Sequence, residues 1–175
     1  MQLSQGVEYA FHSLFYMVDM SVGSTIGIKE LAELNKLSET YLSKIFTKLR
    51  KAGIVRSIQG AKGGYELAKR AQNISFWDIV EAIEGPSYMF QCAEIRQNNI
   101  LADENDACNC SKPCLIKVVM QEAEDQMRNY LSSKNLAWLK EEVYKDFTDT
   151  KKQSMEEWLS NPLNRFAQPS FQWPL

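Results

Sequence analysis

The sequence predicts a mainly α-helical fold with one small β-hairpin. Apolar residues recur at helical spacing over most of the chain, which is typical of amphipathic helices. Glycines separate two short β-prone runs at residues 55–58 and 65–67, which indicates a hairpin. A long apolar stripe after residue 113 has too little chain around it to be covered. We therefore expect that stripe to pair with a second copy of the chain.

The first predicted element is a helix over residues 4–20, with one apolar stripe formed by Val7, Ala10, Phe11, Leu14 and Val18. A short helix follows and ends in a turn at Asn35-Lys36, after which Ser38 is a favourable N-cap for the next helix. Gly53 suits a left-handed position where that helix ends. Two short helices joined by a tight turn form a helix-turn-helix pattern.

The hairpin over residues 55–67 directly follows the second helix of this motif. A basic hairpin that follows a helix-turn-helix in this way is called a wing. Ser75 then caps a short helix over residues 76–83, and Pro113 suits the first turn of another helix. The stripe along this last helix consists of Leu115, Val119, Ala123, Met127, Tyr130 and Leu131. The fold class is therefore a winged helix-turn-helix domain followed by a long dimerisation helix.

Four regions follow from this reading. They are the winged helix-turn-helix domain at residues 1–86, a cysteine-bearing sensor loop at 87–114, a dimerisation helix region at 115–142, and a C-terminal extension of unknown role at 143–175.

Charge is distributed unevenly along the chain. The net charge is −2, but residues 29–70 carry ten Lys or Arg and four Glu, so this segment carries +6 and the remainder −8. A basic segment inside an acidic chain is the pattern expected of a local polyanion site. The segment coincides with the helix-turn-helix and the wing, which points to DNA.

The residues expected to face DNA lie on the second helix of the motif and on the wing. Early helix positions can reach base edges or phosphates, and they are Ser38, Glu39, Thr40, Tyr41, Ser43 and Lys44. Later positions more naturally meet phosphates, and they are Lys48, Arg50 and Lys51. The wing adds Arg56, Gln59, Gly60 and Lys62. A solvated charged helix in a protein-binding module is the alternative reading.

At this point the chain resembles the Rrf2 family of bacterial winged-helix regulators. The matching stretches are "MQLSQGVEYA", "YLSKIFTKLRKAGIVRSIQGAKGGYELA" and the cysteine region before a long helix, and they cover about residues 1–140. The resemblance implies a homodimer that binds a pseudo-palindromic operator on double-stranded DNA and responds to iron–sulfur status, nitric oxide or redox stress. Many members carry Glu-Gln where this chain has Ser43-Lys44, and Arg-Gly where it has Gln59-Gly60. Their operator preference should therefore not be transferred to this chain.

All four cysteines, Cys92, Cys108, Cys110 and Cys114, lie within residues 92–114. Their spacing fits poorly the paired C-x2–4-C knuckles of structural zinc sites. The spacing alone does not exclude a zinc site, a reversible thiol switch or inert thiols. The resemblance favours an iron–sulfur cluster, because members that bind one use three cysteines here, the last two separated by five residues. Cys108 and Cys114 have that separation, and Cys92 and Cys110 are further candidates.

Glu8 and His12, the only histidine, lie four residues apart and so share one helix face. A surface Glu–His pair or a satisfied core histidine is the simplest reading. In cluster-binding relatives, however, a non-cysteine ligand can come from this helix of the partner subunit. The "VEYAFH" stretch matches a "VEYALH"-type subgroup whose members have such a Glu/His pair. The resemblance thus implies a mixed-ligand 2Fe–2S centre that bridges two subunits.

The expected function is a dimeric, sequence-specific transcriptional regulator, usually a repressor, controlled by a redox-sensitive iron–sulfur cluster. The alternatives are a cluster-free thiol-switch regulator, or a metal-binding interaction protein that does not contact DNA. One histidine, no phosphate loop and no nucleophile–base pair argue against an enzyme, and we expect no small-molecule substrate. No apolar run approaches the roughly 18 residues of a membrane span and no signal peptide is evident, so we expect a cytoplasmic protein without a membrane partner.

Overall fold

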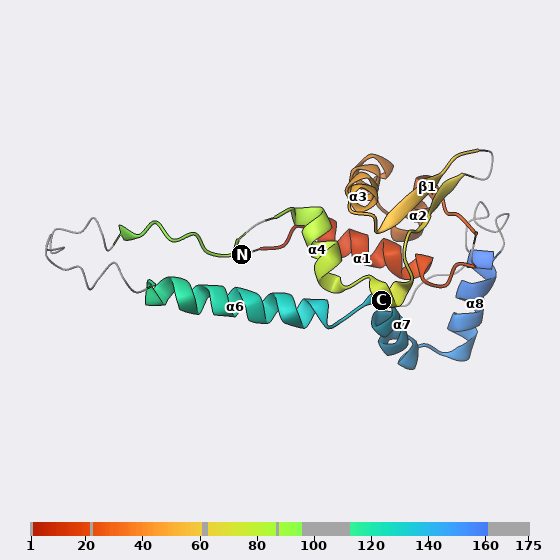
Figure 1. The fold of residues 1–175 in the computed structure, drawn as a ribbon. Helices are drawn as coiled ribbons and strands as arrows, with labels where there is room; N and C mark the ends of the chain where they lie inside the picture. The colour runs from red at the N-terminus through yellow and green to blue at the C-terminus, as the bar shows by residue number, and fades with distance from the viewer. Residues whose placement is uncertain (1, 22, 61–62, 87, 96–112, 161–175) are drawn as a thin grey trace, which may run out of the picture.

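The computed structural model describes residues 2–21, 23–60, 63–86, 88–95 and 113–160. In chain order its elements are α1 (Gln5–Met17), α2 (Ile28–Asn35), α3 (Glu39–Lys51), β1 (Val55–Ile58), β2 (Gly64–Leu67), the 3-10 turn η1 (Ala71–Asn73), α4 (Phe76–Glu84), α6 (Leu115–Ser132), α7 (Leu136–Lys145) and α8 (Asp149–Ser160). Helices α1 to α4 and the hairpin gather into one body, α6 projects away from it, and α7 and α8 return to its side (Figure 1). The mainly helical fold with one hairpin confirms the sequence prediction.

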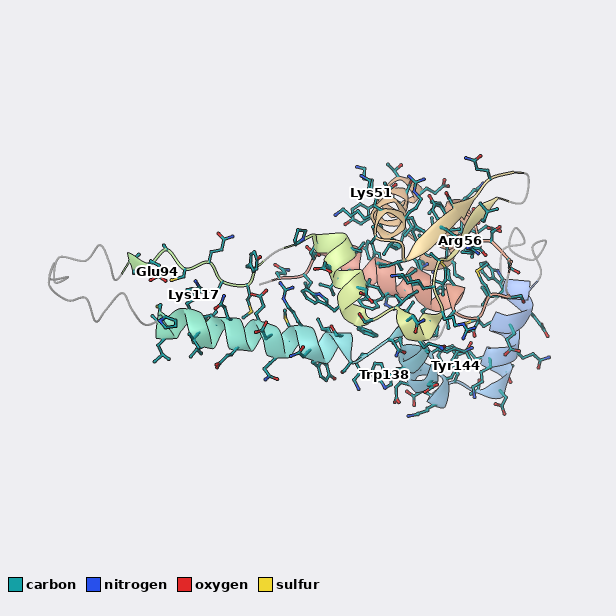
Figure 2. All side chains as sticks on the ribbon, in the orientation of Figure 1. Lys51, Arg56, Glu94, Lys117, Trp138 and Tyr144 are labelled. Carbon is teal, nitrogen blue, oxygen red and sulfur yellow. The ribbon has the colours of Figure 1, made fainter. Side chains whose placement is uncertain are left out.

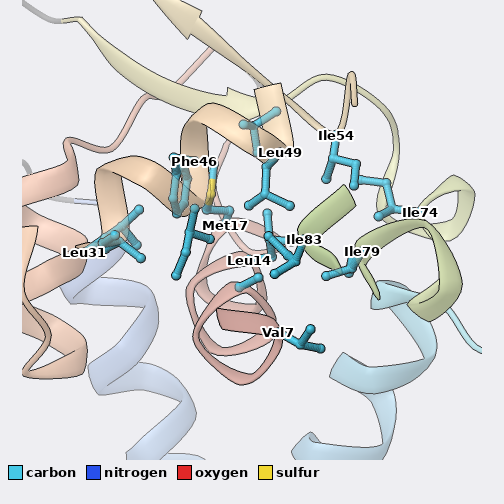
Figure 3. Packing of buried hydrophobic residues seen from close by; sticks show 14 of the residues in the cluster. Val7, Leu14, Met17, Leu31, Phe46, Leu49, Ile54, Ile74, Ile79 and Ile83 are labelled. Carbon is cyan, nitrogen blue, oxygen red and sulfur yellow. The ribbon is translucent and has the colours of Figure 1, made fainter. Parts of the chain in front are cut away.

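Helix α1 runs through the middle of the hydrophobic core. Its apolar stripe packs against α2, α3 and α4. Figure 3 shows Val7, Leu14 and Met17 of α1 together with the core residues Leu31, Phe46, Leu49, Ile79 and Ile83 of the other three helices. Burial of an aliphatic or aromatic side chain of this size contributes about 1.5–3 kcal/mol. The core therefore fixes the position of α3 relative to α1 and α4.

The turn between α2 and α3 has the form that the sequence predicts. Lys36 adopts a left-handed conformation with φ 54°, and the Leu37 N–H donates to the Ala32 carbonyl at 2.8 Å. Ser38 occupies the N-cap position and its carbonyl accepts the first helical hydrogen bond, from the Leu42 N–H, but its side chain forms no capping hydrogen bond. Gly53 at the end of α3 has φ 68°, a left-handed conformation that glycine adopts without steric cost.

The hairpin is attached to the core at its base. Tyr65 of β2 bridges Ile26 with backbone hydrogen bonds in both directions, and its ring lies 5.0 Å from that of Phe46 on α3. A Cβ on Gly64 would come within 2.7 Å of the Ile26 carbonyl oxygen, so this strand position requires glycine. The wing is thus held in a defined place beside α3.

The C-terminal part contains two helices that the sequence did not predict separately, α7 and α8. Helix α6 begins with Cys114 as N-cap, so Pro113 precedes the cap rather than lying in the first turn. Helix α8 was not predicted, and its Met155 and Leu159 are buried against Phe15 of α1. Among the described helices, none combines the length and apolar character needed to cross a membrane.

Candidate functional site

The exposed side of α3 and the hairpin carry the residues predicted to face DNA. Every described member of that set is exposed, namely Ser38, Glu39, Thr40, Tyr41, Ser43, Lys44, Lys48, Arg50, Lys51, Arg56, Gln59 and Gly60. Lys62 lies outside the described residues. Figure 2 shows Lys51 of α3 and Arg56 of β1 on the same upper side of the molecule. Glu39 is the one acidic residue on α3. The arrangement can present cations to phosphate and polar groups to bases.

Arg56 is partly neutralised within the hairpin. Its Nε donates to Glu66 Oε1 at 2.7 Å across the directly paired strand positions. The Arg56 side chain remains 64% exposed, so its other guanidinium N–H groups still face solvent. An exposed pair of this kind adds little stability, and its effect is to orient the guanidinium along the wing.

Tyr41 connects the DNA-facing side of α3 to α1. Its ring packs edge-on against Tyr9 with centroids 5.8 Å apart, and 41% of the residue is exposed. A Cβ on Gly6 would lie 3.4 Å from the Tyr41 hydroxyl and 3.2 Å from Ile83, so α1 and α3 approach closely here. A rotation of α1 would therefore move Tyr41.

Lys48 has a second role besides its predicted phosphate contact. Its ammonium donates to the Ile83 carbonyl at 2.6 Å, close to the C-terminus of α4. A cation at this helix end is favoured by the helix dipole. A lysine has three N–H donors, so two remain available for phosphate. Lys48 thus couples α3 to α4.

Alanine substitutions of Lys44 and Lys48, made separately, should distinguish phosphate binding from the contact between α3 and α4. We expect Lys44→Ala to reduce the slope of log affinity against log salt by about 1, because one phosphate contact is lost, and to leave thermal stability unchanged. Lys48→Ala should reduce the slope similarly and also lower the free energy of unfolding by about 0.5–1.5 kcal/mol. Salt titrations of DNA binding and thermal melts measure both. An unchanged slope in Lys48→Ala would restrict that residue to the α3–α4 contact.

Two of the four cysteines, Cys92 and Cys114, are described. Figure 2 shows Glu94, two residues after Cys92, close to Lys117 near the N-terminal end of α6. Cys114 is the half-buried N-cap of α6, and Cys92 lies on the segment that precedes the undescribed residues 96–112. The Cys92 thiol is 3.6 Å from a Glu94 carboxylate oxygen, and Glu94 has a left-handed φ of 49°. Cys108 and Cys110 lie outside the described residues.

A buried carboxylate ties the Cys92 segment to α6. Glu124 is the only buried residue on α6, and its Oε2 accepts the Met89 N–H at 3.0 Å while Oε1 accepts Arg128 Nε at 2.9 Å. The Arg128 guanidinium lies 4.4 Å from the centroid of Trp77 on α4. The contacts therefore run from the segment near Cys92, through α6, to the helix that Lys48 of α3 contacts. The sequence reading missed these residues, although a Glu–Arg pair four apart beside an apolar stripe is a usable signal.

Glu124 stays charged at neutral pH. The Arg128 hydrogen bond, and next the Met89 N–H, hold the pKa of the Glu124 carboxyl below its ordinary value. A lowered pKa in the folded state means that this link is present at neutral pH and is lost as the pH falls through the folded pKa.

We expect Glu124→Ala to release the Met89 segment. The Met89 amide should then exchange with solvent faster, by a factor on the order of ten, because its acceptor is gone. Glu124→Gln keeps an acceptor oxygen and loses the charge, so it should retain much of the protection and serve as the matched control. Hydrogen exchange read by NMR measures this, and equal protection in all three proteins would contradict the proposed link.

Glu8 and His12 lie together on the exposed side of α1. Both are solvent-exposed and line a recess of about 390 Å³ with Tyr9, Tyr16 and residues 34–37. Within the described part of the chain, neither side chain forms a hydrogen bond or an ion pair. Their shared face agrees with the i, i+4 prediction.

The two described cysteines, Cys92 and Cys114, are not grouped with the Glu8/His12 pair within one chain. The cysteine end of α6 lies at the far side of the molecule from α1 (Figure 1). Among the described residues, no three metal-ligating side chains are grouped. Thiolate, imidazole and carboxylate are chemically suitable cluster ligands, but the described geometry unites these two sets only if a second subunit contributes one of them.

The fold, the basic α3 and the adjoining wing define a winged-helix, DNA-binding transcriptional regulator. The profile of a family described as "Rrf2: Iron-dependent Transcriptional regulator" matches residues 3–142. The chain belongs to the Rrf2 family. Its members are transcriptional regulators rather than enzymes, which confirms that part of the sequence prediction.

Three relatives illustrate the similarity. YffB of Lactococcus lactis, named as a candidate HTH-type transcriptional regulator, is 34% identical over 143 residues, which cover 82% of this chain and 89% of YffB. The structure of CymR, described as the global cysteine regulator of B. subtilis, matches with TM-score 0.63 and 25% identity over 81% of this chain and 97% of that one. T. potens IscR matches with TM-score 0.61 and 24% identity over 85% and 93%, which shows the shared fold.

Proposed function

We propose that this Rrf2 regulator is a homodimeric repressor whose affinity for a pseudo-palindromic operator is set by a 2Fe–2S cluster. The cluster would be held by cysteines of residues 92–114 from one subunit and by Glu8 and His12 from the other. The proposal rests on Glu8 and His12, whose side chains are both exposed and line a recess on α1. Helix α1 also contacts Tyr41 of α3.

The exposed face of α6 supports a dimer. Leu115, Ile116, Val119 and Tyr130 are 74%, 66%, 53% and 64% exposed. At 100° per residue they lie within one third of the helix circumference, on a side different from that of Glu124. Contiguous exposed apolar surface marks an interaction site. Pairing of this face with its copy would bury it and leave the cysteine end of α6 beside the partner's body.

Two sets of contacts can carry a change at the cluster to the DNA-facing helix. On the Glu8/His12 side, Tyr9 packs against Tyr41 of α3. On the cysteine side, the Met89–Glu124–Arg128–Trp77 contacts reach α4, which Lys48 joins to α3. When bound, the cluster supplies a reversible one-electron change and a set of metal–ligand bonds. The residues of the chain convert that local change into the spacing of two α3 helices, which must match half-sites about 34–36 Å apart.

A cluster-free thiol switch is the second candidate. The similarity to CymR, described as a global cysteine regulator, favours it, as do the half-buried thiols of Cys92 and Cys114. In that case DNA binding would respond to peroxide or disulfide reagents in iron-free protein.

An absorption spectrum of protein purified without oxygen, with iron and sulfide assayed on the same sample, separates the two candidates. Our proposal predicts charge-transfer bands in the visible region and about two iron and two sulfide per subunit. A colourless protein that resists reconstitution but binds DNA would contradict it. The thiol switch would then be tested by DNA binding before and after peroxide treatment.

A further inference from the structure

An aromatic pocket lies between α1 and the C-terminal helices. Its volume is about 320 Å³, at the lower end of the range for ligand sites. The side chains that line it come from α1, α4, α7, α8 and the connection between α7 and α8, and they include Phe11, Phe15, Tyr16, Phe76, Phe147 and Met155. Among its described lining residues, only His12 and Tyr16 carry a polar group. The pocket therefore favours an apolar, aromatic occupant.

The C-terminal helices that form one wall are firmly attached to α1. Met155 and Leu159 of α8 are buried against Phe15. Asp19, two residues after the end of α1, forms an ion pair with Lys140 and accepts a hydrogen bond from the Tyr144 hydroxyl, both on α7. Helix α8 ends at Ser160, five residues after the pocket residue Met155. At 1.5 Å per residue, the following chain begins within about 8 Å of the pocket along the helix axis.

The fifteen residues that follow have the composition the pocket favours. The sequence of residues 161–175 is "NPLNRFAQPSFQWPL", with three aromatic side chains, Phe166, Phe171 and Trp173, and a single charge at Arg165. An extended chain covers about 3.3 Å per residue, so each of these rings can return from Ser160 to the pocket. The match to the family ends at residue 142, so this tail and the lining residues Val143, Phe147 and Met155 all lie in the extension.

We propose that the C-terminal tail docks in this pocket of its own chain and places at least one ring of Phe166, Phe171 or Trp173 against Phe15 and Phe76. Offset and edge-on contacts between rings are favourable in such a site. The docked tail covers the side of His12 that faces the pocket and leaves the side that faces Glu8 open. Docking requires no cluster, so it is independent of the proposed function.

His12 provides a specific reporter in the full-length protein, because it is the only histidine. Isotope labelling of histidine alone gives one imidazole signal in NMR spectra. We expect its chemical shift to change in Phe166→Ala, Phe171→Ala or Trp173→Ala, whichever ring docks, and not in the neighbouring control Gln172→Ala. These substitutions lie outside the packed core described above.

Trypsin gives a second readout through Arg165, the only basic residue of the tail. Cleavage of a locally open segment follows the population of the open state. Phe171→Ala or Trp173→Ala, whichever removes the docked ring, should speed cleavage at Arg165 by a factor on the order of ten. This is the smallest change in open-state population expected when the burial of one aromatic ring is lost. Gln172→Ala should be cleaved at the wild-type rate.

Three results would overturn the proposal. The first is a His12 signal and a cleavage rate that are unchanged in all three aromatic variants. The second is a small molecule that native mass spectrometry finds bound to the wild-type protein and whose removal alone changes the His12 signal. The third is a His12 signal that depends on protein concentration, which would assign the pocket to a second copy of the chain.

Discussion

Replacement of both Ile116 and Val119 by glutamate is expected to lower operator affinity about 1,000-fold, the largest effect we predict. The two side chains are 66% and 53% exposed on α6, so their substitution leaves the core described above intact. Two added charges on each copy would face each other across a dimer seam and repel. A monomer can occupy only one half-site, so it should bind the operator little better than non-specific DNA. Specific binding is typically at least about 1,000-fold tighter than non-specific binding.

Sedimentation and DNA-binding titrations of the same samples measure this effect. The DNA is a duplex selected from random sequence by the wild-type protein. Gln121→Glu with Ser132→Glu is the matched control, because it adds the same charge to exposed positions on another side of α6. A variant that remains dimeric and binds like the wild type would exclude this face of α6 as the dimer seam.

Removal of both Glu8 and His12 side chains is expected to abolish stable cluster binding. We predict that Glu8→Ala with His12→Ala, purified without oxygen, loses iron to a chelator at least about 100-fold faster than the wild type. Loss of a hydrogen bond to a ligand already costs 10- to 100-fold in metal affinity, and loss of a ligand should cost more. Because both side chains are exposed, the thermal stability of the iron-free protein should be unchanged.

Glu33→Ala is the control for the second prediction, since it removes an exposed carboxylate from the neighbouring helix α2. Absorption spectra, iron content and chelator kinetics should all match the wild type in this control. If the double variant keeps the wild-type spectrum and iron retention, the cluster does not bridge to α1, and cysteines of one subunit must account for it.

The elements most accurately predicted from sequence depend on local chemistry. The turn at Lys36, the left-handed Gly53 and the Ser75 cap of α4 are determined by residues within a few positions, so the sequence carries the signal. The apolar spacing of α1 is equally local: of its predicted stripe, Val7, Ala10 and Leu14 are buried, and Phe11 and Val18 are partly buried against the core.

Features that depend on distant residues could not be predicted in this way. Helix α8 has a weak apolar pattern, and its burial depends on Phe15, about 140 positions earlier. The contact from Lys48 to the Ile83 carbonyl and the link from Met89 to Glu124 each span 35 residues. No local pattern specifies which lysine caps another helix or which carboxylate is buried, because packing of the whole chain decides both.

Glu8 and His12 illustrate both sides of this division. Their spacing placed them on one helix face from sequence alone, because 3.6 residues per turn brings positions i and i+4 together. Tertiary packing decided that this face opens into a recess, that it lies beside Tyr9 and Tyr41, and that it is far from the cysteine end of α6. These last facts depend on how α1, α3 and α6 pack in space, and helical periodicity contains no information about that.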